Sequence, residues 1–289
     1  MSKRRLGDRK DATLIRKLDS LHYIMPLIYP NRCDNEAFIS ECIDLSELDG
    51  YLENKNSGNP EYKYNLFQAV VTASLRTVVL RPKMNYFIAN KSYYSRNEVS
   101  AGFVVKKVFS DNGGETGAIV KATPDFNIDK VHDEIYRQVS AARGEKSNGS
   151  TEDSLDIFNK MPRFLSRALV AFIRVLDRHG KVPQAFIEGD PYYQSIMLSN
   201  LGSIKLHAGY HHLANWGTNS VFIIIGERKK RPFYDEDGNL TMRDSVDIGM
   251  TVDERIADGY YFSGTVRLLK KLLEHPELLD EEFSKEVDY

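Results

Sequence analysis

The chain mixes segments with helical spacing of apolar residues and shorter segments rich in β-branched and aromatic residues. Helical spacing predicts helices over residues 65–80, 129–143 and 260–273, and a short one over 45–52. Strand-like runs cover residues 38–43, 86–89, 92–95, 99–106, 117–122, 221–226 and 246–252. Asp-Gly and Asn-Gly pairs predict turns at 111–114 and 236–239. Helices and strands therefore follow one another along the whole chain.

Other segments carry weaker patterns. Residues 11–23 place apolar side chains on one helix face, and we expect an opening helix that Pro26 and Pro30 prevent from continuing. Residues 145–153 are polar and predict a loop. Residues 164–176 are almost all apolar but are too short and too charged to span a bilayer. We interpret them as a packed helix, with docking on a membrane surface as the alternative.

Composition narrows the function classes. The 289-residue chain has a net charge of −2, which argues against general nucleic-acid binding. Its two cysteines, Cys33 and Cys42, suit the reduced cytoplasm and supply neither a disulfide framework nor a zinc site. Neither a transmembrane run nor a signal-peptide core is visible. We expect a cytoplasmic protein whose acidic C-terminal tail is frayed.

Two motifs carry chemistry. The stretch Thr-Val-Asp-Glu-Arg-Ile-Ala-Asp-Gly, residues 251–259, lies where a predicted strand meets a predicted helix. Asp258 there could simply cap the helix. The second motif, Ser-Asn-Leu-Gly at residues 199–202, ends another predicted strand. Alone it is compatible with a strand that ends in a turn.

Together the motifs resemble those of the catalytic domain in the acyltransferase component of 2-oxo acid dehydrogenase complexes. That family carries D-H-R-x-x-D-G and T-I-S-N-L-G, and the chloramphenicol acetyltransferases share its fold. Asp253, Arg255, Asp258 and Gly259 match the first pattern, and residues 199–202 match the second. Glu254 stands where the family has its catalytic histidine.

The resemblance implies an α/β fold, a chloramphenicol-acetyltransferase-like two-layer sandwich in which helices cover a mixed β-sheet. It implies a single domain, residues 1–289, without lipoyl or subunit-binding domains, and a helical insertion at 144–194. It also implies a stand-alone homotrimer with active sites between subunits. Coenzyme A or acyl-CoA would be a substrate, without a metal, and the acyl acceptor would be a small molecule or a carrier-borne group.

The resemblance also implies roles for residues. Ser199 would donate to the oxyanion, a contribution of roughly 3–4 kcal/mol. Asp258 would hold the geometry of the active site, and Arg255 would be a further residue of the catalytic motif. Asn200, Gly202 and Trp216 would line the coenzyme site.

Because Glu254 replaces the family's histidine, the motif does not identify the residue that acts as general base. A carboxyl group with a pKa of about 4.3 is a poor base for a thiol with a pKa of about 8.5, whereas imidazole is better matched. Three alternatives remain: Glu254 retuned by burial, His211 or His212 as the base, or a non-catalytic trimer that binds CoA or a protein partner. For the two histidines, structural hydrogen bonding is the favoured interpretation, a channel-lining or catalytic role comes second, and metal ligation is the least favoured.

Overall fold

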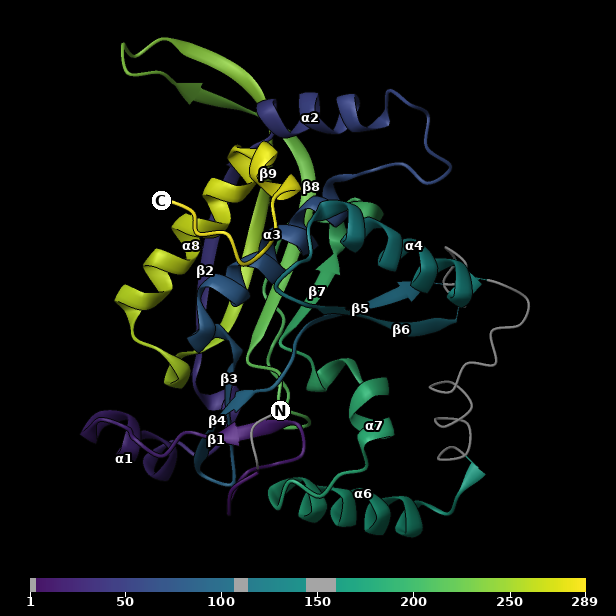
Figure 1. Cartoon of the computed structure of the whole chain (residues 1–289), viewed down its shortest axis with the longest axis vertical. Coiled ribbons are helices and arrows are strands. Elements are labelled where there is room, and N and C mark those ends of the chain that lie inside the picture. The colour runs from purple at the N-terminus through teal and green to yellow at the C-terminus, as the bar shows by residue number, and fades with distance from the viewer. Residues whose placement is uncertain (1–3, 107–113, 144–159) are drawn as a thin grey trace.

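The computed structural model describes residues 4–106, 114–143 and 160–289. Within them, a mixed sheet has the strand order β2-β9-β8-β7-β5-β6, and a small antiparallel sheet has the order β1-β4-β3 (Figure 1). The large sheet contains β2 (Glu36–Asp44), β5 (Val99–Lys106), β6 (Glu115–Ala122), β7 (Ile196–Asn200), β8 (Val221–Tyr234) and β9 (Leu240–Asp253). The small sheet contains β1 (Ala12–Leu14), β3 (Tyr86–Ala89) and β4 (Ser92–Arg96).

Strand β7 is parallel to both of its neighbours, β5 and β8, and the other pairs of the large sheet are antiparallel. The helices packed on one face of this sheet are α3 (Leu66–Leu80), α4 (Ile128–Arg143) and α8 (Gly259–Glu274). Helix α2 (Ser46–Asn56) packs against α8. The opposite face carries a smaller apolar cluster around Met197, Leu213, Phe222 and Ile224. The expected mixed sheet covered by helices is therefore confirmed.

Most predicted elements are present. The helices expected over 65–80, 129–143 and 260–273 are α3, α4 and α8, and the helix expected over 45–52 is the longer α2. Each predicted strand lies within a strand of the structure, and the turn at 236–239 joins β8 to β9. These two strands continue beyond the sheet as a two-stranded ribbon, visible at the top of Figure 1. The turn predicted at 111–114 and the loop at 145–153 fall largely or wholly outside the described residues.

The opening helix predicted over residues 11–23 is wrong. Ala12–Leu14 forms β1 and pairs with β4, and α1 (Ser20–Ile28) starts only at the cap residue Asp19. The apolar spacing fitted a helix, but pairing with β4 buries Ala12 and overrides that local pattern. Pro26 lies inside α1 near its C-terminal end, where one missing hydrogen bond does not stop the helix.

The expectation of a frayed acidic tail is also wrong. Phe283 is fully buried, and the backbone N–H groups of Phe283 and Ser284 donate to the carbonyls of Phe126 and Pro124. The buried guanidinium of Arg76 donates to the carbonyl of Lys285 at 2.9 Å. The last residues are therefore part of the packed structure.

Helix α6 (Arg163–Arg178) is only partly packed, contrary to expectation. None of its residues is buried, and Phe164, Leu165, Phe172 and Val175 are exposed. Its C-terminal end is attached to the rest of the chain because Arg9 forms an ion pair with Asp177 at 2.8 Å. Helix α7 (Gln184–Gly189) follows, so that the described part of residues 144–194 is largely helical. Among the described residues, no helix is long and apolar enough to cross a membrane.

The docked tail predicts a measurable contribution to stability. Phe283→Ala should lower the free energy of unfolding by about 3–5 kcal/mol, because it removes a fully buried ring. Urea unfolding followed by circular dichroism would measure the change. The matched substitution Phe164→Ala, at an exposed position, should change it by less than about 0.5 kcal/mol. Equal effects of the two substitutions would contradict the docked tail.

Candidate active site

The turn between β9 and α8 is built from capping groups. Asp253 ends β9 and accepts from the backbone N–H of Arg255, in the single turn η5 (Glu254–Ile256). Asp258 accepts from the N–H of Tyr261 at 2.8 Å and so caps α8, as predicted. Backbone hydrogen bonds from Asp253 to the carbonyl of Ser220 and from Glu254 to that of Asn35, both 2.9 Å, fix the turn against neighbouring segments. The backbone of this turn is therefore rigidly held.

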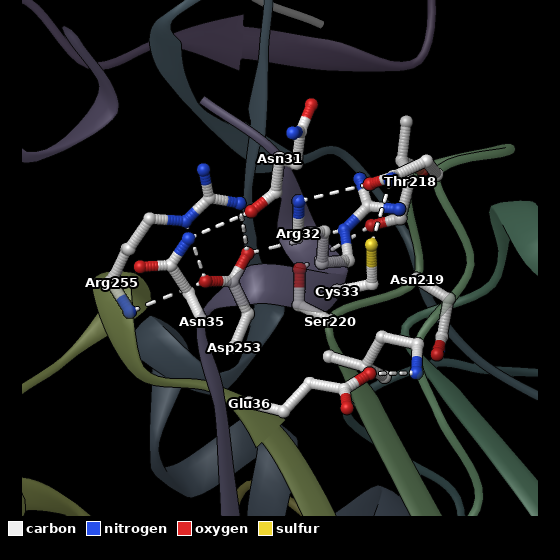
Figure 2. Close-up of polar contacts among 12 residues, drawn as sticks. Asn31, Arg32, Cys33, Asn35, Glu36, Thr218, Asn219, Ser220, Asp253 and Arg255 are labelled. Carbon is white, nitrogen blue, oxygen red and sulfur yellow. Dashed lines mark hydrogen bonds and ion pairs between the residues drawn. The ribbon is translucent and has the colours of Figure 1, made fainter. Parts of the chain in front are cut away.

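A fully buried ion pair lies beneath the turn. Nε and Nη2 of Arg255 each donate to one carboxylate oxygen of Asp253 at 2.7 Å, and both side chains are at most 1% exposed (Figure 2). The remaining Nη1 donates to the carbonyl of Tyr29 at 2.7 Å. The hydroxyl of Tyr93 donates to the carbonyl of Arg255 at 2.9 Å. Arg255 therefore joins the turn to α1 and to β4.

A second arginine approaches the same carboxylate from the other side (Figure 2). Nε of Arg32 lies 3.9 Å from Asp253, and its terminal nitrogens donate to the carbonyls of Ala214 and Gly217 at 2.7 and 3.2 Å. Burial lowers the pKa of Arg32, and the charge of Asp253 opposes that shift. One carboxylate thus holds two arginines and, through them, the segment at residues 214–217.

Glu254 lies on the surface of the turn between β9 and α8. Its side chain is exposed, and among the described residues neither a hydrogen bond nor an ion pair involves its carboxylate. Within one chain, Glu254 therefore lacks the burial that a retuned carboxylate base requires.

Ser199 ends β7 in a different environment. Its hydroxyl is half-buried and, within the part of the chain that the structure describes, has no hydrogen-bond partner. Asn200 caps the following turn by accepting from the N–H of Ser203 at 3.2 Å. A Cβ atom on Gly202 would lie 2.3 Å from the carbonyl oxygen of Gly226, so only glycine fits there. Asn200 and Gly202 thus shape the turn that presents Ser199.

The sheet register separates Ser199 from Glu254 within one chain. Ser199 lies opposite Ile224 on β8, and Ile224 lies opposite Gly249 on β9. Five residues lead from Gly249 to Glu254, which is roughly 16 Å along the strand direction. A single chain therefore does not bring the two predicted groups together.

His211 and His212 lie on a segment that crosses the face of the sheet opposite α3. The carbonyl of Gly209 approaches β9 so closely that a Cβ atom on Gly249 would be 2.2 Å away. His211 packs edge-on against Phe222, with ring centroids 5.0 Å apart, whereas His212 is exposed. Burial, and to a lesser extent His212, lower the pKa of His211. His211 therefore lies on the same sheet face as Ser199, in an environment that disfavours its charged form.

Two further predictions concern ligands. The indole N–H of Trp216 donates to the carboxylate of Asp190 at 2.7 Å, and the ring lies edge-on to Phe186, so Trp216 has structural partners. Among residues 4–106, 114–143 and 160–289, no group of three or more His, Cys, Asp or Glu side chains could hold a metal ion.

Sequence reasoning missed Arg32, Asn35 and Tyr93. Their partners lie roughly 160–220 residues away along the chain, and no local pattern reports such contacts. The motif directed attention to Arg255 and Asp258, and the structure shows the contacts of each, an ion pair with Asp253 and a helix cap.

Comparison with known proteins shows which folds this chain is similar to. Residues 189–280 match the model of the 2-oxoacid dehydrogenases acyltransferase catalytic domain. A probable dihydrolipoamide acetyltransferase from Listeria monocytogenes superimposes with a TM-score of 0.60 at 16% identity, over 99% of both chains. The chain has the fold of these acyltransferases.

Two other structures extend the comparison. Dihydrolipoamide acetyltransferase from Azotobacter vinelandii has a TM-score of 0.60 at 13% identity, over 92% of this chain and 99% of that one. A chloramphenicol acetyltransferase has a TM-score of 0.54 at 15% identity, over 95% and 100%. No curated protein sequence matches the chain. The resemblance and the chloramphenicol-acetyltransferase-like fold inferred from the two motifs are confirmed.

Because two buried arginines share the carboxylate of Asp253, we expect its neutralisation to lower the stability of the fold strongly. Asp253→Asn should lower the free energy of unfolding by about 3–5 kcal/mol, because it leaves two buried arginines without their counter-charge. Denaturant titration would measure the loss. The same substitution five residues later, Asp258→Asn, should cost less than about 0.5 kcal/mol, because asparagine also caps helices. A loss below about 1 kcal/mol for Asp253→Asn would show that the pair is dispensable.

Proposed function

We propose that this protein transfers an acyl group between coenzyme A and an acceptor thiol or hydroxyl. The observation that carries the proposal is the acyltransferase family match, which spans both the strand ending at Ser199 and the turn at Asp253–Gly259. That turn is held by a buried ion pair and two capping carboxylates, as a catalytic turn must be. The matched segment therefore includes a turn whose backbone is held in place by these contacts.

The proposed reaction needs two protein groups at the reacting carbonyl. A base takes the proton of the acceptor, whose sulfur or oxygen then attacks the acyl carbon. The carbonyl oxygen becomes negatively charged in the tetrahedral intermediate, and the Ser199 hydroxyl donates a hydrogen bond to it. Collapse of the intermediate breaks the bond to the CoA sulfur, and the base returns the proton to the departing thiolate.

A site of this kind requires more than one copy of the chain. Ser199 and Glu254 lie roughly 16 Å apart along the sheet of a single chain, so one copy would supply the serine and a neighbour the turn. Helix α1 supports assembly because its side chains Leu21, Tyr23, Leu27 and Ile28 are exposed. We propose a homotrimer with an active site at each contact between subunits.

The alternative is a non-catalytic trimer that binds CoA or a protein partner. It is favoured by one observation, the exposed Glu254 at the position of the family's histidine. In that case the fold and its coenzyme site would be retained without turnover. The two functions differ in their need for Ser199.

Calorimetric titration with CoA and acetyl-CoA, followed by an assay of CoA release with a panel of thiols and alcohols, tests the proposal. We expect binding and turnover, and Ser199→Ala should lower kcat by about 10²–10³ with little change in affinity. Ser203→Ala is the matched control, because its hydroxyl donates locally to the carbonyl of Asn200. Binding without turnover would support the non-catalytic trimer, and an absence of binding would refute the transferase and leave only the trimer that binds a protein partner.

A further inference from the structure

A histidine outside both motifs lies beside the turn that Glu254 occupies. His22 is in the first turn of α1, and its Nδ1 lies 2.6 Å from Oδ2 of Asp19. The other oxygen of Asp19 accepts from the backbone N–H of His22 at 3.0 Å. One carboxylate therefore fixes both the backbone and the ring of His22. A proton on Nδ1 shared with Asp19 leaves the lone pair on Nε2, the tautomer that a general base needs.

Contacts at both ends of α1 place His22 next to η5. Its ring packs edge-on against Tyr93, with centroids 6.0 Å apart, and the Tyr93 hydroxyl donates to the carbonyl of Arg255. At the other end of the helix, the carbonyl of Tyr29 accepts from Arg255. Helix α1 also contacts η5 directly. His22 thus belongs to the same rigid unit as Glu254.

The remaining ring nitrogen of His22 is open to a ligand. Among the described residues, Nε2 makes no hydrogen bond, and the side chain is 17% exposed. The titratable groups in contact with the ring are Asp19, which caps its helix, and Tyr93 on β4. The hydroxyl of Tyr93 in turn reaches the backbone carbonyl of Arg255 on η5. A mostly shielded imidazole with one free nitrogen and an orienting carboxylate is the arrangement of a general base.

We propose that His22, oriented by Asp19, is the general base of the acyl transfer and supplies the imidazole that position 254 lacks. This inference rests on the proposed function. Nε2 takes the proton from the acceptor thiol or hydroxyl, and the same nitrogen returns it to the CoA thiolate when the bond to the acyl group breaks. Ser199 of a neighbouring copy binds the oxyanion. Asp19 is a positioning residue, and Glu254 does not carry the proton.

The test compares acetyl-CoA turnover by the wild-type protein, H22N and H22A over a range of pH. We expect H22N to lower kcat by about 10²–10⁴ without weakening CoA binding. A general base gives kcat/KM a pH dependence, so we expect the wild-type profile to change shape in the residual activity of H22N. Added imidazole should restore part of the activity of H22A. A role in folding alone would predict neither the changed pH profile nor the rescue.

The control and the contrary outcomes are specific. His275 is also paired with a carboxylate, Glu277 at 3.6 Å, but at the far end of α8, so H275N should leave turnover unchanged. Wild-type turnover that survives H22N within a factor of about two would overturn the base while leaving the transferase intact. A loss without imidazole rescue and with an unchanged pH profile would also overturn it. If H22A does not fold, the pH profile of H22N decides. Wild-type protein without any turnover would reject the transferase and the base together.

Discussion

The buried carboxylate of Asp253 is the interaction on which the site depends. It sits at the end of the strand β9, forms two hydrogen bonds with Arg255 and lies 3.9 Å from Arg32. Through these arginines it holds the first helix and the segment at residues 214–217 against the sheet. Removing a carboxylate from water is costly, and the cost is offset only when its partners are fixed and fully hydrogen-bonded. The rigidity of the turn therefore follows from an electrostatic constraint and not from apolar packing alone.

The same constraint organises the chemistry around the sheet. Asp253 stops the strand so that Glu254 emerges at the surface, while Ser199 is presented about five residues away along the sheet direction. The backbone after β7 passes so close to β8 and β9 that the positions Gly202, Gly226 and Gly249 leave no room for a Cβ atom. Ser199 and Glu254 therefore lie apart along the sheet of one chain, and the proposed acyl transfer would require neighbouring copies. The proposed role of His22 concerns the turn at which position 254 lacks an imidazole.

The failures of sequence-based prediction have a common cause. Residues 11–23 have helical spacing, but pairing of β1 with β4 decides their conformation. The C-terminal residues are strongly acidic, yet Phe283 and the buried Arg76 hold them in place. Helix α6 was correctly predicted as a helix, but its expected packing was not found, because amphipathic spacing identifies an apolar face without identifying what covers it. In the first two cases a contact between distant residues outweighed the local pattern, and in the third the local pattern did not say whether such a contact exists.

The sequence by itself determined most of the helices and strands, the mixed α/β architecture and the two motifs, because periodicity and capping are local properties. It also offered the cap at Asp258, which the structure shows. Only the tertiary structure showed that Arg32 shares the carboxylate of Asp253, that Ser199 and Glu254 lie far apart in one chain, and that His22 lies beside η5. These relations depend on sheet register and on contacts across more than 150 residues, and neither is encoded in any short stretch of the chain.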